Sequence, residues 1–131
     1  MTPGTVLASK AVVVDANKDI AGFRYVKPDV QANLAATGST KDDAAAITAQ
    51  IVTVTSNNNA KGVILPAAAT MVFIQNASAG NIFHLYPNAG GTLNGGAANA
   101  GVVIAPSGSV ILVQIAANTW WTLGYSTGLP S

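Results

Sequence analysis

From Ile47 to the end of the chain, short apolar runs alternate with turn signals every eight to twelve residues. The runs are rich in β-branched residues, as in Ile47–Thr55 and Ser109–Ala116, and clusters of Asn, Gly, Ser or Pro separate them. Units of strand, helix and strand would need longer segments with helical periodicity between the strands. The spacing is typical of an all-β sandwich or barrel. We therefore predict an all-β fold, an antiparallel β-sandwich of the jelly-roll kind.

The first forty residues differ from this pattern. Lys10–Asp15 and Ile20–Val26 are predicted as short strands on either side of a turn, and Gln31–Thr40 is small and polar without an apolar period. So little apolar surface cannot form a core of its own. We therefore expect an extended N-terminal arm and linker over residues 1–38 and a sandwich domain over residues 39–131. The other predicted strands are Gly62–Leu65, Thr70–Gln75, Asn81–Tyr86, Gly91–Leu93, Gly101–Ala105 and Thr119–Gly124.

The charges are few and unevenly placed. Charged residues make up 8% of the 131, against about 25% in ordinary domains, and every one of them lies at or before Lys61. A surface without charges provides neither electrostatic steering nor repulsion between copies. We infer that much of the half from Gly62 to Ser131 is covered by copies of the chain or by another protein.

Several classes of protein are excluded by composition. A net charge of +1 with scattered Lys and Arg does not form the basic stripe that nucleic-acid binding requires. No run approaches the ~20 apolar residues of a membrane span, and no secretory signal follows Met1, so we expect synthesis in a cytoplasm. Without cysteine, neither disulfides nor thiolate metal sites stabilise the fold. We expect no nucleic-acid partner and no membrane.

Residues 84–101, HLYPNAGGTLNGGAANAG, contain the only histidine and a high density of glycine. A phosphate-binding loop of the Walker type ends in Lys followed by Ser or Thr, and no Lys follows Lys61. A dinucleotide fingerprint needs a strand, loop and helix followed by an acidic residue, which this half also lacks. Asn94-Gly95 is instead a strong hairpin signal, because both central residues of that turn have positive φ. We predict turns here and no cofactor.

The candidate catalytic and metal-binding residues are weak. In the strand around His84, that residue and Tyr86 would face one side, and no acidic residue follows to form a triad. A structural histidine, with a possible pH effect on the fold or an interface, is the preferred interpretation. Asp42 and Asp43 are adjacent, whereas glycosidase carboxylates approach a bond from opposite sides, so a solvated or capping role is preferred.

A weak calcium site formed by Asp15, Asn17 and Asp19 stays an alternative, although the pattern lacks a glycine turn and a bidentate Glu. We predict that the protein is not an enzyme and holds no metal.

Trp120 and Trp121 are adjacent in the last predicted strand and should point to opposite faces. One ring is expected in the core and the other at an interface, a sugar or solvent, because aromatic side chains are enriched at interfaces. Together with Tyr125, an exposed Trp keeps carbohydrate binding as an alternative. We therefore treat His84, Trp120, Trp121 and Tyr125 as candidate interface residues.

Two parts of the chain resemble small structural proteins of tailed-phage virions. Thr2–Val26 is similar to an arm segment that recurs ahead of different modules, and Gly62–Ala68, Val72–Gly101 and Ser109–Leu123 are similar to a β-module of virion proteins. Together these segments cover about three fifths of the chain. The resemblance implies an oligomeric, non-enzymatic protein. An arm of this type adds a strand to a neighbour's sheet edge through backbone hydrogen bonds.

The leading functional hypothesis is a capsid decoration or cement protein, a trimer on the surface of the phage head, located in the virion. Its partners would be copies of itself and the major capsid protein, and binding only the assembled shell would stabilise that shell. The arm residues expected to contact partners are Lys10, Lys18, Phe23, Arg24, Tyr25 and Lys27. The alternatives are a tail, fibre or baseplate component and a receptor- or carbohydrate-binding β-module.

Overall fold

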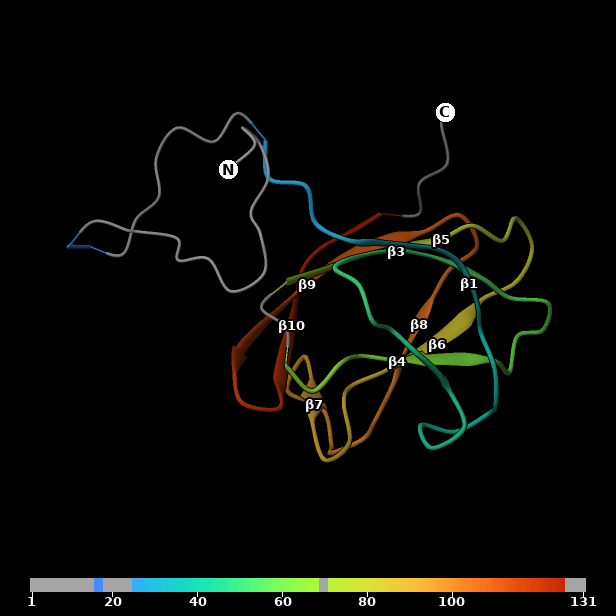
Figure 1. The fold of residues 1–131 in the computed structure, drawn as a ribbon. Helices are drawn as coiled ribbons and strands as arrows, with labels where there is room; N and C mark the ends of the chain where they lie inside the picture. Colours follow the sequence, from blue (N-terminus) through green and yellow to red (C-terminus); the bar gives the residue numbers. More distant parts are fainter. Residues whose placement is uncertain (1–15, 18–24, 69–70, 127–131) are drawn as a thin grey trace.

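The computed structural model describes residues 16–17, 25–68 and 71–126, and these contain β-strands and turns but no helix (Figure 1). The strands are β1 (Val30–Ala35), β2 (Ala45–Ala46), β3 (Ile51–Thr55), β4 (Gly62–Ile64), β5 (Met71–Asn76), β6 (Phe83–Tyr86), β7 (Thr92–Leu93), β8 (Val102–Ile104), β9 (Ser109–Ala116) and β10 (Thr119–Ser126). The all-β prediction is confirmed. All the strands predicted from Ile47 onward are present, with ends shifted by up to four residues.

The strands form two mixed sheets. Sheet A has the order β1-β3-β5-β9-β10-β7, and sheet B has the order β2-β4-β6-β8. From β1 to β6 the chain enters the two sheets alternately, so that it winds around the molecule (Figure 1). Each circuit takes about 20 residues, from Val30 to its partner Ile51 and from there to Phe73.

This winding corrects the expectation of antiparallel pairing. A chain that returns to the same sheet after crossing the other one runs in the same direction each time. The pairs β1–β3, β3–β5, β2–β4 and β4–β6 are therefore parallel, as is the short pair β7–β10. Among the strand pairs of the described residues, the three that involve β8 or β9 are antiparallel. The jelly-roll connectivity is not confirmed.

The core lies between the two sheets, in a sandwich-like arrangement. Alternate residues of each strand point inward, as shown by Val52 and Val54 of β3 and by Val72 and Ile74 of β5, all buried. From sheet B, Phe83 and Leu85 of β6 are fully buried in the same cluster. Period-two alternation of this kind is what a half-buried strand requires.

Residues 30–38, expected in the arm and linker, belong to the folded part. β1 pairs in parallel with β3, Ala36 is buried in the core, and Thr37 pairs with Gly62 of β4. The sequence lacks an apolar period here because Gln31 points inward and hydrogen-bonds Ala46 and Thr48 with its side chain. A local irregularity at Asn33, which has a φ of 57°, breaks the alternation as well.

Candidate functional site: the outer face of sheet A

The outer face of sheet A is apolar over much of its width. On an antiparallel pair, residues directly opposite each other share one face, and the same holds for neighbours in a parallel register. The register aligns Val30, Ile51, Phe73 and Ile111 in one row across β1, β3, β5 and β9. These side chains alternate with the buried ones, so the row faces away from the core.

A second row lies beside the first. Met71 of β5 is opposite Val113 of β9, which is opposite Trp121 of β10. Trp121 is 41% exposed, Ile111 is 37% exposed and Val30 is 60% exposed, while the other members are half-buried. We define the apolar patch as Val30, Ile51, Met71, Phe73, Ile111, Val113 and Trp121.

A polar row borders the apolar patch. Thr53, Gln75 and Ser109 lie in register across β3, β5 and β9 on the same outer face. Between this row and the row that contains Phe73 and Ile111 lies a shallow hollow of about 300 Å³. Each side chain of the polar row carries both hydrogen-bond donors and acceptors. A partner surface of the same composition can therefore satisfy it.

The apolar patch contains no charged side chain. The charged residues of the described part lie before β1, in the turn of residues 41–43 and at Lys61, and none belongs to β3, β5, β9 or β10. Contiguous apolar areas of a few hundred Å² on a soluble protein usually mark an interaction site. The geometry of the patch suits a broad contact with another protein surface and provides no chemistry for a covalent reaction.

The two tryptophans point to opposite faces, as predicted. Trp120 is completely buried, and its Nε1 donates a hydrogen bond of 2.9 Å to Oδ1 of Asn88. Trp121 belongs to the apolar patch and lies close to Gly95, where an added Cβ would be 3.6 Å from its ring.

Tyr125 does not join Trp121 in one binding platform. It is opposite the inward-facing Val110, and its hydroxyl accepts a hydrogen bond of 3.0 Å from the N–H of Ala105, beyond the end of β8. Half of the Tyr125 side chain is exposed, but on the other side of the sheet from Trp121. The stacking surface expected for a carbohydrate is therefore reduced to Trp121 alone.

His84 and Tyr86 share one face of β6, as expected from the alternation, and the structure shows that this is the outer face of sheet B. Its ring stacks on Tyr86 with centroids 6.2 Å apart and an angle of 20°. The Tyr86 ring in turn lies over two glycines, since an added Cβ would be 2.6 Å from it at Gly62 and 2.8 Å at Gly101. The Tyr86 hydroxyl donates to the carbonyl of Ser39 at 3.2 Å. These contacts give His84 and Tyr86 a role in packing.

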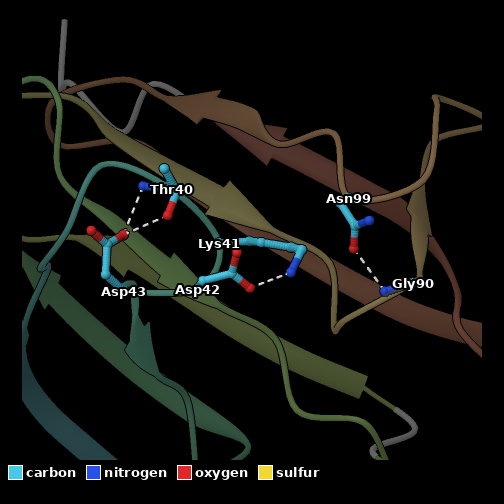
Figure 2. Close-up of polar contacts among 6 residues, drawn as sticks. All are labelled: Thr40, Lys41, Asp42, Asp43, Gly90 and Asn99. Carbon is cyan, nitrogen blue, oxygen red and sulfur yellow. Dashed lines mark hydrogen bonds and ion pairs between the residues drawn. The ribbon is translucent and has the colours of Figure 1, made fainter.

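The glycine-rich stretch forms turns, as predicted, but Asn94-Gly95 does not close a hairpin, because β7 pairs with β10 and the following strand, β8, belongs to sheet B. Asn94 and Gly95 have φ angles of 54° and 74°, and the N–H of Gly96 donates to the carbonyl of Leu93 at 3.0 Å. The side chain of Asn99 accepts a hydrogen bond of 2.7 Å from the N–H of Gly90, which joins the two turns (Figure 2). These backbone N–H groups thus donate their hydrogen bonds within the protein.

Asp42 and Asp43 diverge, as expected of neighbours in sequence (Figure 2). Asp42 pairs with Lys41, whereas the Asp43 carboxylate accepts hydrogen bonds from the N–H of Thr40 at 2.8 Å, its hydroxyl at 2.8 Å and the N–H of Ser39 at 3.0 Å. The bonds from Thr40 chiefly hold the pKa of Asp43 below its ordinary value. The Asp43 carboxylate therefore stabilises the turn that contains Ser39 and Thr40.

Most of the predicted arm contacts fall outside the described residues: Lys10, Lys18, Phe23 and Arg24, together with Asp15 and Asp19 of the calcium alternative. Tyr25 and Lys27 are described, and both are exposed just before β1. Within the described ranges, no group of three or more His, Cys, Asp or Glu side chains lies close enough to hold a metal ion. No helix of those ranges is long and apolar enough to cross a membrane.

Sequence reasoning did not single out two asparagines that join parts of the fold. Asn76, at the end of β5, is completely buried and donates from Nδ2 to the carbonyls of Asn81 at 2.9 Å and Ala105 at 3.0 Å. Asn88 bridges Trp120 and Asn118. Asn76 ends its strand and Asn88 follows one, in the turn-like contexts NAS and PNA, where asparagine is ordinary, so the sequence carries little signal of their burial.

Comparison of the chain with protein-family models, with curated proteins and with solved structures finds no match.

Proposed function

We propose that this protein is a structural component of a tailed-phage virion, a decoration or cement protein that binds and stabilises the assembled head. The observation that carries the proposal is the broad, uncharged and apolar outer face of sheet A. A protein that keeps such a face in solution needs a partner to cover it, because exposed apolar area favours association. The resemblance of Thr2–Val26 and of the β-module to virion proteins supports the same function.

In this proposal the protein is a trimer without enzymatic activity, and the arm binds neighbouring subunits or the major capsid protein. The exposure of Tyr25 and Lys27 beside the first strand is compatible with contacts from this part of the chain. The stabilisation works by mass action, since a ligand that binds only the assembled shell shifts the equilibrium toward it.

The test is the location and copy number of the chain in purified particles of the phage that encodes it, by cryo-electron microscopy. We expect regular density on the head surface at a fixed ratio to the major capsid protein. A few copies at the tail or baseplate would replace this proposal with the tail alternative. Absence from the particle would refute both.

A truncation tests the role of the arm. The deletion of residues 2–28 ends before β1 and spares Asp29, whose carbonyl accepts a hydrogen bond from the N–H of Ile51. We expect the truncated chain to fold, with an unchanged far-UV circular dichroism spectrum between 200 and 240 nm, and to lose shell binding. Equal decoration of shells by the truncated and full chains would contradict the role of the arm.

A further inference from the structure

We propose that the outer face of sheet A is covered by the same face of further copies of this chain, so that the apolar patch is the contact between subunits. The inference rests on the proposed self-assembly and adds which surface carries it. In this arrangement the N-terminal arm contacts the shell, and the outer face of sheet A contacts other copies.

The size of the face lies at the lower limit for a specific contact between copies. Five strands spaced about 4.8 Å apart are about 24 Å wide, and six residues at about 3.3 Å each are about 20 Å long. The flat area is thus about 480 Å² per copy, or about 960 Å² for two copies. Stable interfaces bury about 1,000 Å² or more in total, and side-chain relief adds to the flat figure.

The chemistry of the face fits an identical surface. The apolar patch has no charge that would select an oppositely charged partner, and two copies brought together meet no like-charge repulsion. The bordering Thr53, Gln75 and Ser109 each donate and accept hydrogen bonds, so they can pair with their own counterparts. An interface between identical patches requires such self-complementarity.

Sheet faces of this kind also pack together without rearrangement. Two twisted sheets stack about 10 Å apart, with their strands rotated by about 30°, and side chains from both faces interdigitate. Ile111 and Phe73 lie near the centre of the apolar patch, beside the hollow of about 300 Å³. Direct stacking of two identical faces relates the copies by a two-fold axis, whereas in a three-fold assembly the three faces would meet around the axis and each would contact both neighbours.

The test is the mass of the full chain in solution by size-exclusion chromatography with light scattering, at tens of micromolar. We expect a small multiple of 13.1 kDa for the unmodified chain. Ile111→Lys should reduce the mass to 13.1 kDa, because it places a charge in the centre of the contact. Val103→Lys is the matched control, since Val103 is also an exposed strand residue but lies on the outer face of sheet B.

A second variant guards against misfolding. Ile111→Thr keeps the β-branched shape and should raise the dissociation constant at least tenfold, with an unchanged circular dichroism spectrum. In the unmodified chain, dilution to the monomer should also make the fluorescence of Trp121 more accessible to iodide, and Trp121→Phe should abolish this change.

A monomeric unmodified chain, or an oligomer that both Ile111 variants leave intact, would overturn the inference. Either result leaves the virion proposal standing if the chain is still found on heads. Conversely, an oligomer that Ile111→Lys dissociates would support the inference even if the chain were absent from particles.

Discussion

The substitution Asn76→Ala tests whether this buried amide holds the two sheets together. Asn76 is at the end of β5 in sheet A, and its Nδ2 donates to the carbonyls of Ala105 and, at 3.3 Å, of Ile104, at the end of β8 in sheet B. Its Oδ1 accepts from the N–H of Ser78 at 2.9 Å, and its third Nδ2 contact is the carbonyl of Asn81. Alanine removes all of these hydrogen bonds and leaves the backbone groups that took part in them without the Asn76 side chain as a partner.

The expected loss follows from the number of bonds. About three good hydrogen bonds at about 1 kcal/mol each, with a further 1–2 kcal/mol for backbone groups left unpaired, give a loss of about 4–5 kcal/mol in the free energy of unfolding. At about 4 °C per kcal/mol for a domain of this size, Tm should fall by about 16–20 °C. Urea unfolding and differential scanning calorimetry measure both quantities.

Two further variants make the Asn76 prediction specific. Asn76→Asp keeps the shape but replaces the donor with a carboxylate that faces carbonyl oxygens, so at pH 7 it should destabilise at least as much as alanine. Asn57→Ala is the control, because Asn57 is exposed and its loss should change stability by less than about 0.5 kcal/mol. The reasoning fails if Asn76→Ala loses less than about 1 kcal/mol, or if Asn76→Asp is as stable as the parent at pH 7.

The remaining predictions concern other single contacts. Hydrogen bonds lower the pKa of Asp43 in the folded protein, so their stabilisation is present above the unfolded pKa and is lost as the pH falls through the folded pKa. In urea unfolding at a series of pH values, the free energy of unfolding of Asp43→Asn should therefore fall less with acid than that of the unmodified chain. Gly62→Ala forces the Tyr86 ring to move and should lower the free energy of unfolding by about 1–3 kcal/mol in thermal unfolding. The control Gly80→Ala places its methyl group in open space and should leave the stability unchanged. Equal melting temperatures of the two variants would refute this prediction. Trp120→Phe loses the buried indole hydrogen bond and should cost about 2–4 kcal/mol in urea unfolding; a cost below about 1 kcal/mol would contradict its place in the core.

The sequence was a good guide to strands and a poor one to their partners. Alternation within single runs predicted that His84 and Tyr86 share one face of their strand and that Trp120 and Trp121 diverge; which face is buried, that of Phe83 and Leu85, came from the structure. Strand pairing depends on which sheet the chain enters after each loop. Turn residues indicate that the chain changes direction, but they do not indicate which sheet the next strand joins. β1 was missed for a related reason, because Gln31 occupies an inward position where an apolar residue would have revealed the strand.

The candidate site was only partly predictable. The absence of charge after Lys61 indicated a covered surface, but not where on the molecule it would lie. The apolar patch takes residues from β1, β3, β5, β9 and β10, which meet only through the cross-strand register. Tyr125 and Trp121 are close in sequence and were grouped as one candidate, yet an irregularity in register between Thr122 and Gly124 precedes Tyr125, which pairs with the inward-facing Val110.

The winding of the chain gives the last strands a particular part in biosynthesis. β9 lies between β5 and β10, so the edge of β5 stays open until residues beyond Val113 have left the ribosome. Contacts between segments so distant in sequence form slowly, and an unpaired strand edge is prone to wrong pairings while it waits. A chain that stops before the β9–β10 hairpin should therefore be degraded or aggregate, so that complete synthesis acts as a checkpoint on the supply of subunits.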